Sequence, residues 1–89
     1  MKSKYKFNFT CVCPNDKEVI HYEAIIESSD TIMVEDINEY ALTLNKLELY
    51  QEDITLLISE KFKSKVTTFG THQGVDIECN TNWFIIMVP

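Results

Sequence analysis

The sequence has little of several things, and each shortage excludes a class of protein. No apolar run approaches the roughly 18 residues that a membrane-spanning helix needs, and no apolar segment follows the basic residues 1–6. We therefore expect no membrane association, no secretory signal and a cytoplasmic location. The sequence contains 8 lysine and arginine residues but 14 aspartate and glutamate residues. The resulting formal net charge of −6 argues against a broad phosphate-binding surface. Three cysteines, an odd number, do not form a disulfide framework; a reactive thiol or buried free cysteines are expected instead.

The hydrophobic fraction, in contrast, is that of an ordinary globular protein, at 45% of 89 residues. We therefore predict a single domain over residues 1–89. A chain of this length is near the lower limit at which a core supports itself, and its terminal segment 83–88 is apolar. Both features are consistent with an obligate homo-oligomer.

Alternation of apolar and polar residues predicts four strands, over residues 5–12, 19–27, 65–69 and 75–79. The first two flank the short turn Pro14–Lys17, which indicates an antiparallel hairpin. The last two are joined across Gly70–Gly74. Trp83–Val88 is expected to add an edge strand or to dock as a hydrophobic tail.

Helical spacing of apolar residues predicts two helices between the strand pairs. The expected buried stripes are Val34, Ile37, Ala41 and Leu44 in the first helix, and Ile54, Leu57, Ile58 and Phe62 in the second, which spans about residues 52–63. The order strand-strand-helix-helix-strand-strand predicts an α+β fold, with two helices layered on one face of a four-stranded antiparallel sheet.

Four segments carry a resemblance to a known family. Phe9–Pro14 looks like an F-x-x-x-C-P nucleophile segment, and Val34-Glu35-Asp36 falls where a cofactor motif opens. Leu49–Asp53 resembles an aromatic-His-Glu segment, and Phe69–Ile77, followed by Asn80-Thr81-Asn82, resembles F-x-P-R-G-G-I-x-I with its trailing Asn. In this order the segments resemble the tunnelling fold (T-fold), and within it the 7-cyano-7-deazaguanine (preQ0) reductase family, QueF, and its QueF-like amidine-forming relatives.

The resemblance implies a ββααββ domain that assembles into oligomeric barrels, with ligand sites between subunits. It also implies that Cys13 is the catalytic thiol, and that Glu52 binds the base together with Gln51, Glu35 and His72. The sequence departs from the family where Gln51 replaces a histidine and His72 replaces an arginine. The lysines of the cofactor motif are missing, and Ile20 stands where an acidic residue is expected, with Asp16 and His21 nearby.

The chemistry explains why these residue types are required. A thiolate can attack a nitrile carbon to give a covalent thioimide, and a proton donor must then reach the nitrile nitrogen. His21 is the first candidate donor, because imidazole exchanges protons near neutral pH, and Asp16 is the second. The simpler alternatives are that Cys13 is only a small core residue and that His21 is a solvated strand residue.

Glu52 can accept two parallel N–H bonds from a guanine-like edge, although a carboxylate at a helix start is also common. A metal site is not expected, because the cysteines and the two histidines lack clustered ligand spacing.

The missing lysines favour amidine formation with ammonia and no cofactor, giving an archaeosine-type 7-formamidino-7-deazaguanine. The alternatives are an NADPH-dependent preQ0 reductase and a catalytically inactive T-fold binding or inhibitory module. The expected ligand is a 7-deazaguanine base, free or in nucleic acid. A polynucleotide would need lysines gathered on one rim, for which six are available: Lys2, Lys4, Lys6, Lys61, Lys63 and Lys65.

Overall fold

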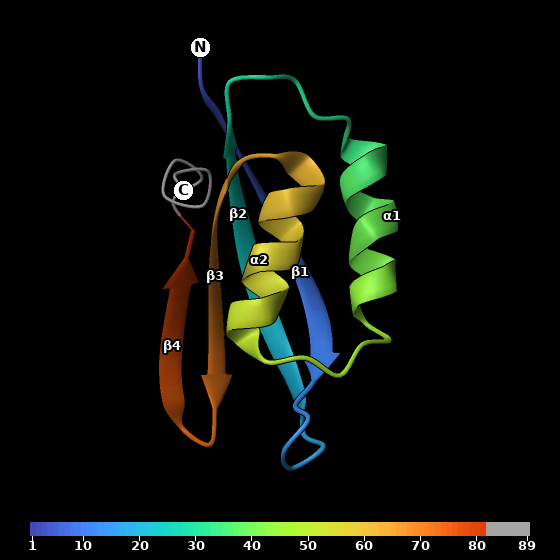
Figure 1. Cartoon of the computed structure of the whole chain (residues 1–89), viewed down its shortest axis with the longest axis vertical. Coiled ribbons are helices and arrows are strands. Elements are labelled where there is room, and N and C mark those ends of the chain that lie inside the picture. Colours follow the sequence, from blue (N-terminus) through green and yellow to red (C-terminus); the bar gives the residue numbers. More distant parts are fainter. Residues whose placement is uncertain (82–89) are drawn as a thin grey trace, which may run out of the picture.

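The computed structural model describes residues 1–81 and confirms the predicted order of elements. One antiparallel sheet contains, in spatial order, β1 (Ser3–Val12), β2 (Val19–Ser28), β3 (Lys65–His72) and β4 (Val75–Asn80). The helices α1 (Val34–Leu44) and α2 (Gln51–Phe62) cover the same face of this sheet (Figure 1). Neither of these helices is long and apolar enough to cross a membrane. The strand or tail expected at residues 83–88 lies outside the described residues.

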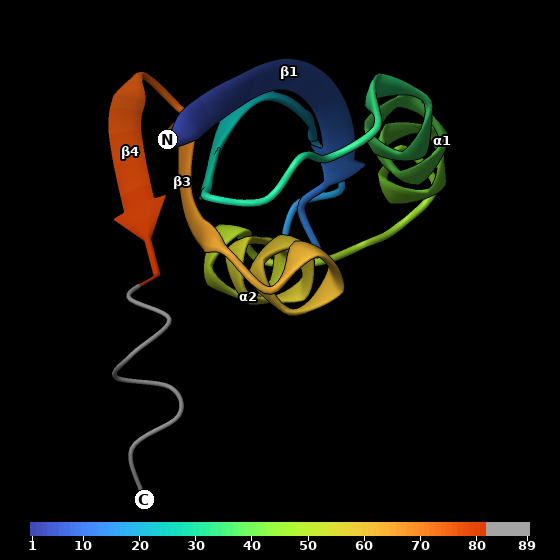
Figure 2. The same ribbon diagram turned by 90° about the horizontal axis from the view of Figure 1, so that it is seen from above.

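The core lies between the sheet and the two helices, as the end-on view shows (Figure 2). Alternation in β1 and β2 places every second side chain in this core, as predicted. Cys11, Ala24 and Ile26 are fully buried from the strands, and Leu44 and Ile54 are fully buried from the helices. The apolar residues of both N-terminal strands therefore form the inward face of the sheet.

The predicted helix stripes are correct in part. Val34 and Leu57 are 58% and 37% exposed, so neither belongs to the fully buried face. On α1 the buried residues are Ile37 and Leu44, which means that contact with the sheet begins after the first turn.

On α2 the buried face includes two hydroxyl side chains that hydrophobic spacing does not detect, Thr55 and Ser59. The Thr55 hydroxyl donates to the Gln51 carbonyl at 2.7 Å and lies 2.7 Å from the Thr68 hydroxyl. The Ser59 hydroxyl donates to the Ser64 carbonyl at 2.6 Å. These hydrogen bonds make burial of the hydroxyl groups tolerable.

The β3–β4 connection is shorter than the predicted loop over residues 70–74. β3 continues to His72, and the turn consists of Gln73 and Gly74, whose φ angles of 50° and 80° match the two-residue turns favoured in hairpins. Gly70 therefore lies inside the strand. A Cβ at this position would come within 2.5 Å of the Tyr22 ring, so the missing side chain lets that ring pack across β3.

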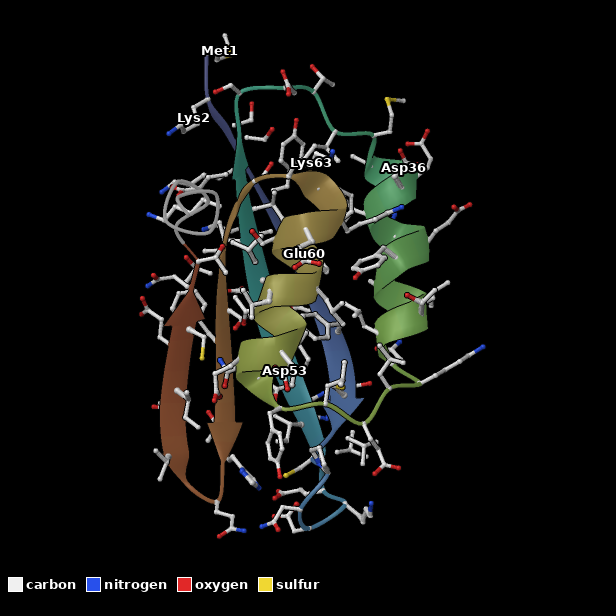
Figure 3. All side chains as sticks on the ribbon, viewed as in Figure 1. Met1, Lys2, Asp36, Asp53, Glu60 and Lys63 are labelled. Atoms are coloured by element: carbon white, nitrogen blue, oxygen red, sulfur yellow. The ribbon has the colours of Figure 1, made fainter. Side chains whose placement is uncertain are left out.

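Lysines gather at the end of the molecule where β1 begins, α2 ends and β3 begins (Figure 3). Lys2 and Lys63 mark this end, and Lys4 and Lys65 both pair with Glu27 at 3.5 Å. Cys13 follows the opposite end of β1, in a molecule whose longest extent is 39 Å. Four of the six lysines named above, Lys2, Lys4, Lys63 and Lys65, thus form a lysine cluster at one end of the chain, far from the candidate thiol.

Two aliphatic residues of α2 test the observed helix face. Ile54→Ala should lower the free energy of unfolding by about 2–5 kcal/mol, because Ile54 is fully buried. Leu57→Ala should cost about 1 kcal/mol or less, because its side chain is partly solvated. Urea denaturation of both variants measures the difference. Equal losses would mean that Leu57 packs in the core as the sequence pattern predicts.

Candidate active site

The segment between the helices runs beside the end of β1 and positions the start of α2. The Val12 amide donates to the Leu47 carbonyl at 3.0 Å, and the Leu49 amide donates to the Val12 carbonyl at 3.2 Å. The Cys11 thiol also donates to the Leu47 carbonyl, at 2.9 Å. Because residues 50–52 follow directly, the first turn of α2 lies next to Cys13.

A small cavity of about 80 Å³ occupies this junction. Cys13 lines it from the end of β1, Gln51 and Glu52 line it from the start of α2, and Gly70 and His72 line it from β3. Cys13 is only 5% exposed, whereas Glu52 is exposed. The predicted thiol and the predicted base-binding carboxylate therefore line one cavity.

Cys13, Asp16 and His72 form a cluster within this junction. The Cys13 Sγ, an Asp16 carboxylate oxygen and a ring nitrogen of His72 all lie within 4.8 Å of one another. The His72 Nε2 is 2.8 Å from the Asp16 Oδ2 and 3.3 Å from a carboxylate oxygen of Glu18. The cluster joins the loop after β1 to the end of β3, which are separated by more than 50 residues in the sequence.

Hydrogen bonds hold the pKa of the Asp16 carboxyl well below its usual range. The backbone N–H of Glu18 has the largest effect, followed by the side chains of His72 and Gln73. The Glu18 amide donates to the Asp16 Oδ1 at 3.0 Å, and the Gln73 side-chain amide donates to the Oδ2 at 2.9 Å. Asp16 is thus ionised at neutral pH and has no proton to donate, which argues against its predicted role as a proton donor. An ionised carboxylate is instead suited to orient the His72 ring.

Gln51 and Tyr22 form the inner wall of the cavity. The Gln51 Nε2 is within 3.2 Å of the carbonyl and hydroxyl oxygens of Thr68 and 3.0 Å from the Ile77 carbonyl, so this amide nitrogen holds β3 and β4. A ligand role for Gln51 is therefore left to its side-chain oxygen, which lies close to Gly70. Burial raises the pKa of Tyr22 to about 12, so its hydroxyl stays protonated.

The site residues predicted from the sequence include neither Tyr22 nor Gly70. A glycine within a strand was the available signal, since it often marks a close approach of another group. Which side chain approaches it depends on the strand register, which pairs Tyr22 with Gly70.

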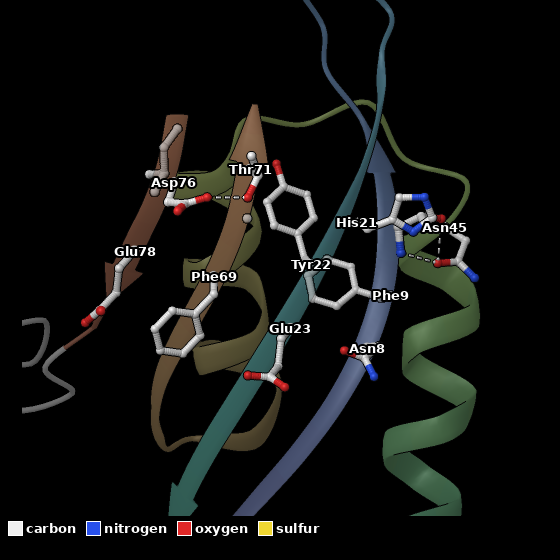
Figure 4. Close-up of a pocket in the computed structure, with 13 residues that line it drawn as sticks. Asn8, Phe9, His21, Tyr22, Glu23, Asn45, Phe69, Thr71, Asp76 and Glu78 are labelled. Atoms are coloured by element: carbon white, nitrogen blue, oxygen red, sulfur yellow. Dashed lines mark hydrogen bonds between the residues drawn. The ribbon is translucent and has the colours of Figure 1, made fainter. Parts of the chain in front are cut away.

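Two predicted site residues lie elsewhere. His21 projects from the opposite face of β2, where it lines an open groove with Asn45 and Glu23 (Figure 4). Glu35 lies in the first turn of α1, near the end of the molecule where β2 finishes. Within one chain, neither residue reaches the Cys13 cavity, so His21 is not placed to protonate a group bound there.

The groove around His21 is larger than the Cys13 cavity, at about 910 Å³, but none of the residues that line it is a cysteine. Cys11 and Cys79 are free and do not line the Cys13 cavity. Burial raises the pKa of both thiols, which makes them poorer nucleophiles. Cys13 is the cysteine that lines the cavity, together with Glu52 and His72.

The sheet with its paired helices defines a T-fold, as predicted. The chain is similar to a solved structure described as the archaeosine synthase QueF-Like in the apo form, with a TM-score of 0.84 and 22% sequence identity. The similarity covers 90% of this chain and 90% of that one. No protein-family model and no curated protein matches the sequence.

The lowered pKa of Asp16 predicts a pH-dependent contribution to stability. The ionised carboxylate stabilises the fold fully above the unfolded pKa of about 3.9, and this contribution is lost as the pH falls toward the lower folded value. In metal-free buffer, Asp16→Asn should therefore be less stable than the wild type at pH 7. Urea denaturation should show this difference shrinking below about pH 4. A difference that stays constant down to pH 3 would contradict the assignment.

Proposed function

We propose that the protein is a thiol enzyme that converts the nitrile of a 7-deazaguanine base, preQ0, to an amidine. The observation that carries the proposal is the meeting of Cys13, Glu52 and His72 at one cavity, with Asp16 paired to His72 beside it. The T-fold and the likeness to an archaeosine synthase support the same class of reaction. Glu52, exposed at the mouth of the cavity, is suited to accept the two N–H groups of the guanine-like edge.

In the first step the Cys13 sulfur attacks the nitrile carbon. A carbon–sulfur bond forms, one π bond of the nitrile breaks, and the nitrogen takes the proton that the thiol released, giving a thioimide. We propose that the Asp16–His72 pair carries this proton, since its polar atoms lie within 4.8 Å of the Cys13 sulfur and an imidazole oriented by a carboxylate can accept and return a proton. His72 thus takes the role that the sequence had suggested for His21.

In the second step ammonia attacks the thioimide carbon. The carbon–sulfur bond breaks, the sulfur regains a proton, and the 7-formamidino product leaves. The overall reaction of the two steps is the addition of ammonia to a nitrile. It involves no oxidation or reduction, so no redox cofactor is required. Reduction with NADPH is less well supported, because Glu35, the remaining residue of the resembled cofactor motif, lies away from the cavity.

The charges around the cavity favour a free base over a base within nucleic acid. Asp16, Glu18, Glu48 and Glu52 lie on the segments that border it, and the nearby Lys17 is paired with Glu48. Phosphates would be repelled here, and the lysine cluster lies at the other end of the chain. An uncharged base avoids this repulsion.

A second copy of the chain would complete the site. The cavity is small and Glu52 is exposed beside it, so a bound base would extend outward from one chain. Phe69, Val75 and Ile77 are also exposed on the β3–β4 hairpin, at 36%, 59% and 36%. We propose that these side chains are covered in a homo-oligomer.

Covalent capture of preQ0 tests the proposed chemistry. Incubation of the protein with preQ0 should add the mass of one base, measured on the intact protein, because the thioimide retains every atom of the nitrile. Cys13→Ala should form no adduct, whereas the matched control Cys79→Ala should form it normally. Ammonium should then release the adduct as the amidine.

If the wild type forms no adduct, the proposed enzyme activity is excluded, and the alternative of a catalytically inactive binding or inhibitory module is favoured. An adduct that persists in Cys13→Ala would place the reactive thiol elsewhere.

The substrate form is tested by comparing free preQ0 with a short RNA that contains the same base. At about 0.15 M salt we expect adduct formation with the free base to be faster by an order of magnitude or more, because the carboxylates repel the RNA backbone. An equal or faster reaction of the RNA would overturn this preference without affecting the thioimide chemistry. Time-resolved intact mass provides both rates.

A further inference from the structure

The Cys13, Asp16 and His72 cluster contains three kinds of side chain that bind zinc. A thiol, a carboxylate and an imidazole offer one atom each, and these atoms lie within 4.8 Å of one another. No other group of three or more such residues occurs within residues 1–81. Glu18 adds a second carboxylate, 3.3 Å from the His72 Nε2.

Two anchored turns hold these residues in place. In the loop after β1, the Cys13 amide donates to the Glu18 carbonyl at 2.8 Å, and the Lys17 amide donates to the Cys13 carbonyl at 2.9 Å. His72 is the last residue of β3 and pairs with Val75 across the two-residue turn. The ligands therefore come from two turns whose backbones are already fixed, which lowers the entropic cost of metal binding.

The charge at the cluster favours a cation. His72 lies between the carboxylates of Asp16 and Glu18, and the adjacent lysine, Lys17, is paired with Glu48. A divalent ion would replace the proton between Asp16 and His72 and the proton of the thiol. Zinc holds such ligands at about 2.0–2.3 Å, so three ligand atoms that already lie within 4.8 Å of one another can close around one ion. A thiolate and an imidazole favour zinc over magnesium or calcium.

We propose that Cys13, Asp16 and His72 bind Zn²⁺, with Glu18 or water as the fourth ligand. The ion would hold the Cys13 sulfur and compete with any electrophile for it, so the bound form would be protected from alkylation. This site rests on the geometry of the cluster and does not depend on which substrate the thiol attacks.

Cobalt, a coloured substitute for zinc, tests the site. Titration of the full chain with Co²⁺, without oxygen and without any nitrile, should give the near-ultraviolet sulfur-to-cobalt absorption with an endpoint at one equivalent. Cys13→Ser should abolish this absorption, and Cys79→Ser, the matched control, should leave it unchanged. Asp16→Asn and His72→Gln should each weaken binding by on the order of 10–100-fold or more. Circular dichroism of each variant verifies that it is folded.

A wild-type titration without this absorption would overturn the proposal, and so would absorption that survives in Cys13→Ser or disappears in Cys79→Ser. The wild type alone gives a second measurement in case a variant does not fold. Equimolar Zn²⁺ should slow the modification of Cys13 by a small alkylating reagent at least tenfold, as measured by peptide mass, and should leave Cys79 unaffected. Equal rates with and without zinc would count against the site.

Discussion

The candidate site depends on the hydrogen bonds between the end of β1 and the segment that joins the two helices. The Val12 amide and carbonyl both bond to this segment, and the buried Cys11 thiol adds a third bond. Without these contacts the start of α2 would have no fixed position relative to Cys13. A backbone pairing of one strand residue thus sets the distance between the proposed nucleophile and the carboxylate proposed to bind the base.

A second constraint acts from the other side of the cavity. Asp16 accepts hydrogen bonds from Glu18 in its own loop and from Gln73 in the β3–β4 turn, and it pairs with His72. One ionised carboxylate therefore connects the first hairpin of the sheet to the second. The same contacts explain why this position suits a proton relay and, with the thiol, a metal ion.

The sequence predicted the strands well because alternation in β1 and β2 follows directly from burial of one face. It predicted the inward face of α2 less well, because Thr55 and Ser59 are buried through hydrogen bonds that hydrophobicity does not reveal. Cys13 and Glu52 were found through local motifs, and they line one cavity. His72 was predicted to bind the base, but its pairing with Asp16 was not predicted, because that contact depends on how two distant turns meet.

The chain positions of the cavity residues, from Cys13 to Ile77, have a consequence for synthesis. The thiol is translated before β3 and β4, the strands that help to enclose it. Pairing over such sequence separations is slow, because long loops must close first. Until β3 and β4 are in place, the cavity around the Cys13 sulfur lacks one wall, so this thiol is more accessible in the nascent chain than in the folded protein.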